Sequence, residues 1–397
     1  MSADHPFLYQ LFLIFVCAKL GGEIFERLRL PAVLGEILAG VIVGPYGLGL
    51  VVPTGAIKDV AEVGAIFLLF TVGLEIQPKD LLSVGPTSLY VALAGIAVPF
   101  VFGFSYMLLT QHSKPEATFV AAAMVATSVG VTARILGDLD LLHTQAARII
   151  LGAAVFDDIL GLILLGVVGG LVSGNGGFWV QTLITSLEAV AFALIMMFYA
   201  PRVVRRIEPR LERMSMPNAP LIIALAICLG LSFAAAQIKM AAIVGAFFAG
   251  LAFAEHSPRW NLRPRVLAIN DFLAPFFFFS MGAQLDIRVF DRSLFLSAIV
   301  VFLLAFLSKL VGCGLPVLRF GWKTAARVGM GMVPRGEVGL IVALSGLQMN
   351  AISERAYALV IFMTGVTTLV APPLLKLLFQ SERQPVVVTL EGRPSAM

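Results

Sequence analysis

Long apolar segments, separated by charged or Pro- and Gly-rich breaks, fill most of this 397-residue chain. About 20 consecutive apolar residues are enough for a helix to cross the hydrocarbon core of a bilayer. Hydrophobic residues make up 59% of the chain and charged residues only 13%, a balance that excludes a soluble protein with a polar surface. The sequence therefore predicts an all-α polytopic membrane protein with about 13 transmembrane helices, at residues 7–26, 31–51, 60–76, 86–110, 117–137, 146–173, 178–201, 219–237, 240–256, 266–285, 293–318, 323–348 and 356–379.

The basic residues favour one orientation. With these spans, nineteen Lys and Arg fall on one side of the membrane and six on the other. The positive-inside rule then places the N-terminus outside and the C-terminus in the cytoplasm. No hydrophilic stretch is long enough for a folded domain, so we expect a single membrane domain over residues 1–397 and no soluble regulatory domain. Basic residues in short loops do not indicate nucleic-acid binding, and the four histidines lack the spacing of metal ligands, so no cofactor is expected.

Three segments recur in order at nearly one offset. AVLGEILAG (residues 32–40) aligns with AIVGAFFAG (residues 242–250), the segment around Gly73 aligns with that around Gly282, and the segment around Gly130 aligns with that around Gly336. The second span therefore corresponds to the ninth. Because seven crossings separate them, the two halves are predicted to be inverted repeats, which in transporters hold the substrate at the membrane midplane.

Two adjacent carboxylates, Asp157 and Asp158, lie in the middle of an apolar run. Counted from Arg148 at the helix rise, they lie about 14–15 Å deep, near the bilayer midplane. A charged side chain at this depth costs at least about 2.5–3.5 kcal/mol, and its usual explanation is an ion or proton site. A purely structural ion pair is the alternative.

Lys309 lies at a similar depth in the eleventh span, ten residues before Arg319. Snorkelling to an interface is the alternative, but neither interface is close, so we expect Lys309 to pair with an aspartate. Consecutive helical residues diverge by about 100°, so Asp157 and Asp158 must face different ways. One can then contact Lys309 while the other faces a water-filled cavity.

Helix-breaking and hydroxyl residues cluster in the middle of two spans that correspond in the repeat. Thr127 and Ser128 lie in the fifth span, and Pro334 in the twelfth. Matched broken helices indicate a substrate site in transporters, although a plain proline kink with hydroxyls bonded to their own helix is the alternative. Arg335 and Glu337, beside the second break, are interpreted as structural charges.

The carboxylate and hydroxyl oxygens of these spans are suitable ligands for a hard monovalent cation. Asp158, Asp157 and Thr127 supply carboxylate and hydroxyl ligands for Na⁺ or Li⁺, and the ligand types do not separate Na⁺ from K⁺. A low dielectric disfavours the charged forms of carboxylates and amines, so such groups can exchange protons near physiological pH. Proton and cation are expected to compete for one site.

The motifs resemble those of a known family. PAVLGEILAGVIVGP, EVGAIFLLFTVGLE, ATSVGVTARIL, ILGAAVFDDILGL and GMVPRGEVGLIVA, with the Lys309 span, are similar to the cation:proton antiporter superfamily of monovalent cation exchangers, and most similar to bacterial NapA-type Na⁺/H⁺ antiporters. The resemblance implies an inverted-repeat antiporter fold with two crossed discontinuous helices and a homodimer. It also implies a mobile core at about 86–173 and 293–379, a dimerisation scaffold at about 7–76 and 219–285, and a linker helix at about 178–206.

The resemblance also implies roles for individual residues. Asp158 would carry the cation or proton, Asp157 would pair with Lys309, and Thr127 and Ser128 would belong to the unwound site. We therefore predict an electrogenic antiporter, not an enzyme, that exchanges cytoplasmic Na⁺ or Li⁺ for external H⁺ by an elevator movement. We expect the protein to lie in a bacterial cytoplasmic membrane, in contact with membrane lipid, and to have a role in pH homeostasis. The alternatives are a K⁺/H⁺ antiporter of the same fold, a Na⁺-coupled organic-anion symporter and a channel.

Overall fold

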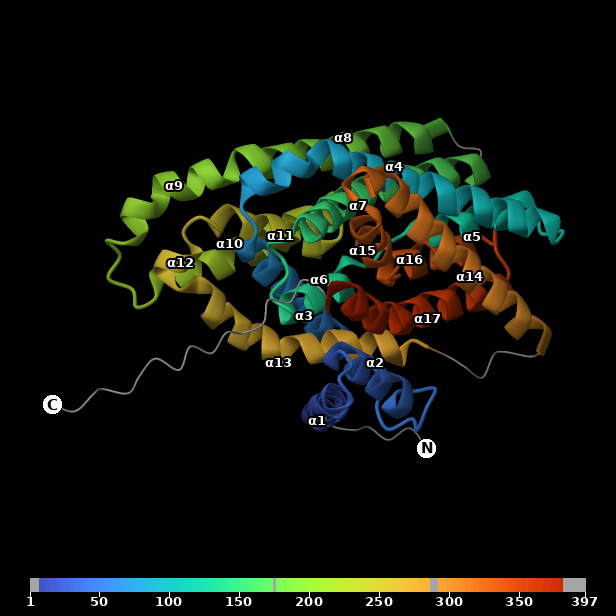
Figure 1. Cartoon of the computed structure of the whole chain (residues 1–397), viewed down its shortest axis with the longest axis horizontal. Coiled ribbons are helices and arrows are strands. Elements are labelled where there is room, and N and C mark those ends of the chain that lie inside the picture. The colour runs from blue at the N-terminus through green and yellow to red at the C-terminus, as the bar shows by residue number, and fades with distance from the viewer. Residues whose placement is uncertain (1–6, 174–175, 286–291, 381–397) are drawn as a thin grey trace.

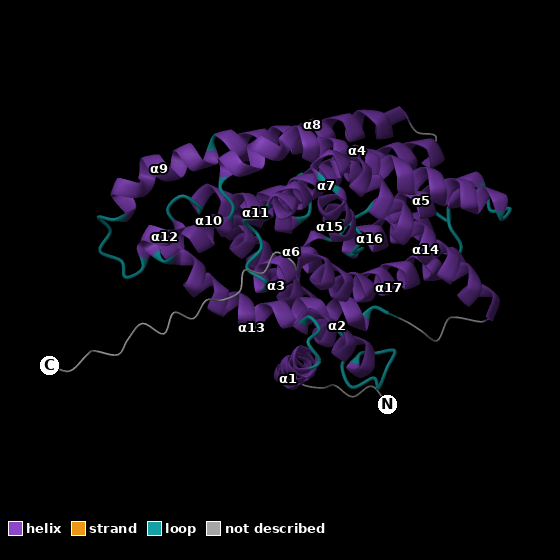
Figure 2. Cartoon of the chain, viewed as in Figure 1, coloured by secondary structure: helices purple, strands orange, loops and turns teal. Residues whose placement is uncertain are grey.

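The computed structural model describes residues 7–173, 176–285 and 292–380 (Figure 1). Every regular element in these ranges is helical (Figure 2). The elements are α1 (Phe7–Arg27), α2 (Ala32–Val43), α3 (Gly55–Glu75), α4 (Pro78–Leu109), α5 (Lys114–Val125), α6 (Val129–Asp138), α7 (Gln145–Ser173), α8 (Gly176–Phe198), α9 (Ala200–Leu211), α10 (Ala219–Gln237), α11 (Ala242–Phe253), α12 (Ser257–Trp260), α13 (Leu262–Ala283), α14 (Arg292–Gly314), the 3₁₀ segment η1 (Leu315–Phe320), α15 (Trp322–Gly331), α16 (Glu337–Gln348) and α17 (Glu354–Phe379).

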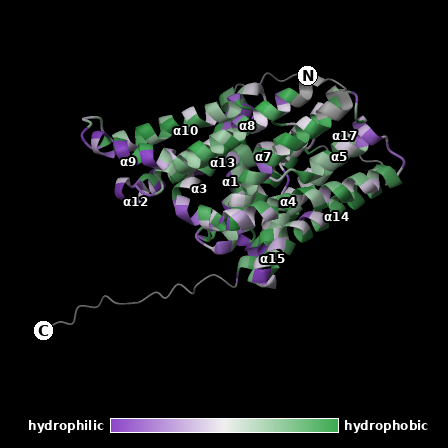
Figure 3. Cartoon of the chain, turned by 90° about the horizontal axis from the view of Figure 1, so that it is seen from above, coloured by the Kyte–Doolittle hydropathy of each residue, from purple (hydrophilic) through white to green (hydrophobic). Residues whose placement is uncertain are grey.

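The helices follow the apolar runs of the sequence. Within the described residues, nine helices are long and apolar enough to cross a membrane, and three further apolar helices are shorter. Hydrophilic residues collect at α9, α12 and other helix ends, whereas the helix bodies are hydrophobic (Figure 3). The all-helical membrane fold is therefore confirmed, and the total of thirteen crossings stays a prediction.

Two predicted spans are each divided into two helices. The fifth span, 117–137, forms α5 and α6, with a non-helical stretch at residues 126–128. The twelfth span, 323–348, forms α15 and α16, and residues 333–336 between them are not helical. Both interruptions lie where the sequence placed helix-breaking residues.

The side chains pack into two groups of helices. One buried apolar cluster joins α4, α5, α7, α14, α16 and α17, which with α6 and α15 we name the core group. Two other clusters join α1, α2, α3, α10, α11 and α13, which we name the scaffold group. A further cluster crosses between them, and α8 and α9 run along one edge of the view in Figure 1. The division into a mobile core and a dimerisation scaffold stays a prediction.

Close glycine contacts occur at equivalent places in the two halves of the scaffold group. A Cβ added to Gly40 of α2 would lie 2.0 Å from the Phe279 carbonyl oxygen of α13. One added to Gly250 of α11 would lie 2.2 Å from the Phe70 carbonyl oxygen of α3. Gly40 aligns with Gly250 in the internal repeat, and α3 and α13 carry another aligned pair, so the repeated sequence also repeats a packing contact.

Alanine at these glycines should destabilise the protein because its methyl group would overlap a backbone carbonyl. We expect Gly40→Ala and Gly250→Ala each to lower the free energy of unfolding by about 1–3 kcal/mol, the usual cost of overpacking. Thermal unfolding in detergent measures the effect. Gly85→Ala is the matched control, because a Cβ there meets nothing within 4 Å. Equal stability of all three variants would contradict the packing argument.

Candidate functional site

The two helix interruptions contact each other. The backbone N–H of Ser128, in the first interruption, donates a hydrogen bond to the carbonyl oxygen of Pro334 in the second, at 2.8 Å. Gly336 lies so near the first interruption that a Cβ on it would be 2.6 Å from the Cβ of Ser128. Pro334 has no N–H and cannot continue a helical hydrogen-bond ladder. The sequence therefore opens both helices at one place in the core group.

Arg335 holds the end of α5. Its side chain is fully buried, and Nη1 donates to the carbonyl oxygens of Val125 at 3.0 Å and Ala126 at 2.8 Å, while Nη2 donates to Ala305 at 3.2 Å. The last carbonyls of a helix lack partners within it and attract positive charge. Arg335 thus contacts the end of α5 and the backbone of α14, and its role as a structural charge stays a prediction. The side chain of Glu337, the other charge predicted here, lies outside the described residues.

Lys309 contacts Asp157 and the same helix end. Its Nζ lies 3.2 Å from Oδ1 of Asp157 and donates to the Val125 carbonyl oxygen at 2.6 Å. Lys309 is 0% exposed and Asp157 4%. Gly95 of α4 packs beside this pair, where a Cβ would lie 2.5 Å from Sγ of Cys313. Opposite charges out of water need both each other and further hydrogen bonds, and the lysine has both.

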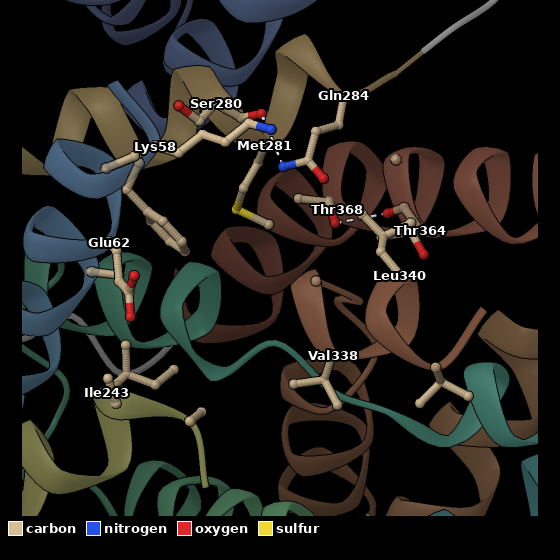
Figure 4. Close-up of a pocket in the computed structure, with 18 of the residues that line it drawn as sticks. Lys58, Glu62, Ile243, Ser280, Met281, Gln284, Val338, Leu340, Thr364 and Thr368 are labelled. Carbon is tan, nitrogen blue, oxygen red and sulfur yellow. Dashed lines mark hydrogen bonds between the residues drawn. The ribbon is translucent and has the colours of Figure 1, made fainter. Parts of the chain in front are cut away.

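Asp158 lines a cavity. The cavity has a volume of about 670 Å³ and lies between α2, α3, α11 and α13 of the scaffold group and α7, α16 and α17 of the core group (Figure 4). Most of its lining is apolar. Its charged and polar lining residues are Lys58, Glu62, Asp158, Lys239, Ser280, Gln284, Thr364 and Thr368. The adjacent acids thus face different surroundings, because successive positions of α7 diverge.

The predicted cation ligands do not all lie on the cavity. Of the three, Asp158 lines the cavity, whereas Asp157 faces Lys309. The hydroxyl of Thr127 donates to the carbonyl oxygen of Met332 at 3.4 Å, so Thr127 faces the second interruption. Ser128 is buried beside it. The structure brings Thr127, Ser128 and the α15–α16 interruption together, and a common cation site with Asp158 stays a prediction.

Other residues at this place escaped the sequence analysis. Thr368 of α17 lines the cavity and donates its hydroxyl hydrogen to the carbonyl oxygen of Arg335. Figure 4 shows it beside Thr364, whose carbonyl oxygen also accepts from it, at 2.8 Å. The available signal was the i, i+4 spacing of these two threonines in an apolar span. The backbone acceptors at Val125, Ala126 and Ala305 had no signal in the sequence.

Comparisons with known proteins agree on one kind of relative. Residues 12–381 match the profile of the family described as sodium/hydrogen exchanger, transmembrane. The chain is 34% identical to the high-affinity Na⁺/H⁺ antiporter NhaS3 of Synechocystis, over 95% of this chain and 90% of that protein. It is 33% identical to the Na⁺/H⁺-K⁺ antiporter GerN of Bacillus cereus, over 95% and 97% of the two chains.

A solved structure shares the fold. The sodium proton antiporter MjNhaP1 of Methanocaldococcus jannaschii superposes with a TM-score of 0.62, covering 94% of this chain and 96% of that one, at 18% sequence identity. At this identity the likeness concerns the fold alone.

Replacing Arg335 by lysine should weaken the protein although the charge is kept. A single ammonium cannot reproduce the forked contacts with three carbonyls, and an unpaired buried acceptor costs about 1–3 kcal/mol. We expect Arg335→Lys to lower the thermal unfolding temperature clearly. Arg206→Lys, at an exposed position of α9, is the control and should leave it unchanged. The same unfolding temperature for both variants would refute the structural role.

Proposed function

This chain belongs to the sodium/hydrogen exchanger family, and we propose that it is an electrogenic antiporter that exchanges cytoplasmic Na⁺ or Li⁺ for external H⁺. That it is a transmembrane cation/proton antiporter rests on the family. The preference for Na⁺, the charge movement and the mechanism are our proposals. The observation that carries them is the division of two adjacent acids, with Asp158 on a cavity and Asp157 on a buried lysine.

Asp158 is the proposed carrier. A carboxylate can hold either a proton or a hard cation, and in surroundings of low dielectric the two compete for it. Thr127, Ser128 and the carbonyls of the interruptions lie nearby in the core group and complete an oxygen site in our proposal. Exchange follows from this competition, because Asp158 must lose its proton before it binds the cation.

Lys309 makes the exchange electrogenic. In our cycle Asp158 and Lys309 arrive from outside protonated, and the Asp157–Lys309 pair is neutral. On the cytoplasmic side one Na⁺ displaces both protons, so two positive charges enter for each one that leaves. The buried pair at 3.2 Å supports this coupling, because Lys309 can lose its proton when the cation takes over the charge of Asp157.

Alternating access by an elevator movement of the core group fits the position of the cavity. The open end of the cavity is lined by three exposed residues, Lys58, Lys239 and Gln284. We assign this end to the outside, because the loops that hold Lys58 and Lys239 lie on the side with fewer Lys and Arg residues in the positive-inside count. The described conformation would then be open to the outside.

Ion pairs join the two groups at the middle of α13 and at its N-terminal end, away from the open end of the cavity. Arg134 of α6 lies 3.7 Å from Asp271, and Arg263, in the first turn of α13, lies 3.6 Å from Asp140 in the turn after α6. Gln284, by contrast, follows the last residue of α13 at the cavity. A cytoplasmic opening requires these contacts to break, which the proposed movement of the core group would do.

The scaffold group is the proposed surface for a homodimer in a bacterial cytoplasmic membrane. Helix α1 presents large exposed apolar side chains, among them Phe7, Leu8, Phe12, Leu20 and Ile24. Such a surface has to face either lipid or a second copy of the chain. A role in pH homeostasis follows if the direction of exchange is as proposed.

K⁺/H⁺ exchange is the second candidate. One relative of 33% identity, GerN, is named a Na⁺/H⁺-K⁺ antiporter, and a hard-oxygen site does not by itself distinguish the two ions. Proton movement driven by Na⁺, Li⁺, K⁺ or choline in the same proteoliposomes decides between them.

Asp158→Asn should abolish exchange, because an amide cannot carry the proton or neutralise the cation. We expect proteoliposomes that hold this variant to show no Na⁺- or Li⁺-dependent proton movement, measured with a pH-sensitive dye. Gel filtration checks that the variant is folded. Exchange at the wild-type rate by a folded Asp158→Asn protein would remove Asp158 from the mechanism.

Without the charge of Lys309, the rate of exchange should no longer depend on the membrane potential. Lys309→Ala leaves the buried carboxylate of Asp157 without its partner, which should lower the free energy of unfolding by about 3–5 kcal/mol. The double variant Asp157→Asn, Lys309→Met removes both charges and is the control for this loss of stability. Any exchange that remains should no longer respond to an imposed potassium-diffusion potential. Voltage sensitivity equal to that of the wild type would contradict the assigned role.

A further inference from the structure

The cavity has a second carboxylate that the proposed cycle does not use. Its described lining holds two acids, Asp158 on α7 of the core group and Glu62 on α3 of the scaffold group. The other charged lining residues are Lys58 and Lys239. Glu62 therefore belongs to the scaffold wall of the cavity that Asp158 lines from the core group.

Glu62 is unpaired in the part of the chain that the structure describes. It is exposed to the cavity, and Lys58, one turn earlier, is not within ion-pair distance of it. Figure 4 shows the Lys58 side chain extending toward Ser280 and the Glu62 carboxylate toward Ile243. The neighbouring acid on the same helix, Glu75, is held by Arg263 at 2.6 Å. The charge of Glu62 therefore acts on whatever enters the cavity.

A charge on a mostly apolar wall has a strong effect on ions. Low-dielectric walls focus the field of a charged group and raise the local concentration of its counter-ion, by about 10-fold or more. Carboxylate oxygens are also ligands that hard cations prefer. A cation that moves between Asp158 and the open end of the cavity thus passes an oxygen ligand that is not occupied by a lysine or arginine.

Two buried hydroxyls on the same lining lack partners in the described structure. Ser280 of α13 and Thr364 of α17 are 8% and 5% exposed, and neither side-chain oxygen has a hydrogen-bond partner. Both lie on the cavity with Glu62. Unpaired buried oxygens on this lining are acceptors that a partly hydrated cation can use.

We propose that Glu62 is a transient binding position for the cation on the scaffold wall, through which the cation passes between Asp158 and the outside. The proposal rests on the antiport function above and adds a residue that sets apparent affinity. Because Glu62 belongs to the scaffold group, it meets Asp158 only in the conformation described. Glu62 receives the cation from Asp158 during export, and returns it when exchange runs in reverse, but it does not travel with the cation.

The test compares three charge changes on one helix. In proteoliposomes whose protein is oriented as in the cell, with proton movement driven by Na⁺ in the outer solution, Glu62→Gln should raise the KM for Na⁺ by about 10-fold, with a much smaller change in the maximal rate. Lys58→Gln, which removes a positive charge from the same lining, should lower the KM. Asp59→Asn is the matched control, because Asp59 is exposed on α3 and does not line the cavity.

The shift should persist when choline chloride raises the ionic strength, because charges inside a cavity are screened less than surface charges. Equal KM values for Glu62→Gln and Asp59→Asn would overturn the proposal. Loss of the maximal rate in Glu62→Gln at an unchanged KM would do so as well, since it would make Glu62 a carrier. A wild-type protein that moves no protons with Na⁺, Li⁺ or K⁺ would instead refute the antiport function itself.

Discussion

The carbonyl groups at the end of α5 are the constraint on which the site depends. A helix that stops inside a membrane leaves carbonyl oxygens unpaired, and no lipid can satisfy them. The carbonyl oxygen of Val125 accepts from both Lys309 and Arg335, which come from different helices. The positively charged side chains of Lys309 and Arg335 thus stabilise the interruption of the helix. Asp157 in turn balances the charge of Lys309. The interruption of α5 and the buried charges are therefore one arrangement, in which each part makes the others possible.

Because Asp157 and Asp158 are adjacent in sequence, a single helix, α7, places two carboxylates in different surroundings, where they can have different roles. A buried charge that loses its partner is costly, so Asp157 is held while Lys309 is protonated. Asp158 lies one residue further along α7 and faces the cavity, where it can bind and release ions. Because both residues belong to one rigid helix, a cation that reaches Asp158 is also near the field of the Asp157–Lys309 pair. In the proposed cycle this nearness links the proton of Lys309 to the cation.

The sequence predicted those parts of the site that consist of unusual side chains in apolar runs. The two interruptions lie where helix-breaking and hydroxyl residues cluster, and the common depth of Asp157, Asp158 and Lys309 stays a prediction from helix rise. Which acid contacts Lys309 depends on the rotation of α7, which its packing against other helices sets and periodicity in one sequence does not. Backbone acceptors carry no sequence signal, because every residue has a carbonyl. Glu62 was visible as an acid near a span, but its importance depends on a cavity that only the tertiary packing forms.

The same packing explains why the two walls of the cavity should behave differently. In the scaffold group, helices approach until glycine and backbone touch, as at Gly40 with Phe279 and at Gly250 with Phe70. Such contacts have no side chain that can change its rotamer, and close-packed interiors resist small displacements. The scaffold wall that carries Glu62 is thus held by backbone contacts, whereas the core group meets it across the cavity and through exchangeable ion pairs such as Arg134 with Asp271. In the proposed cycle the core group therefore moves past a scaffold wall that stays in place, so that Asp158 moves and Glu62 does not.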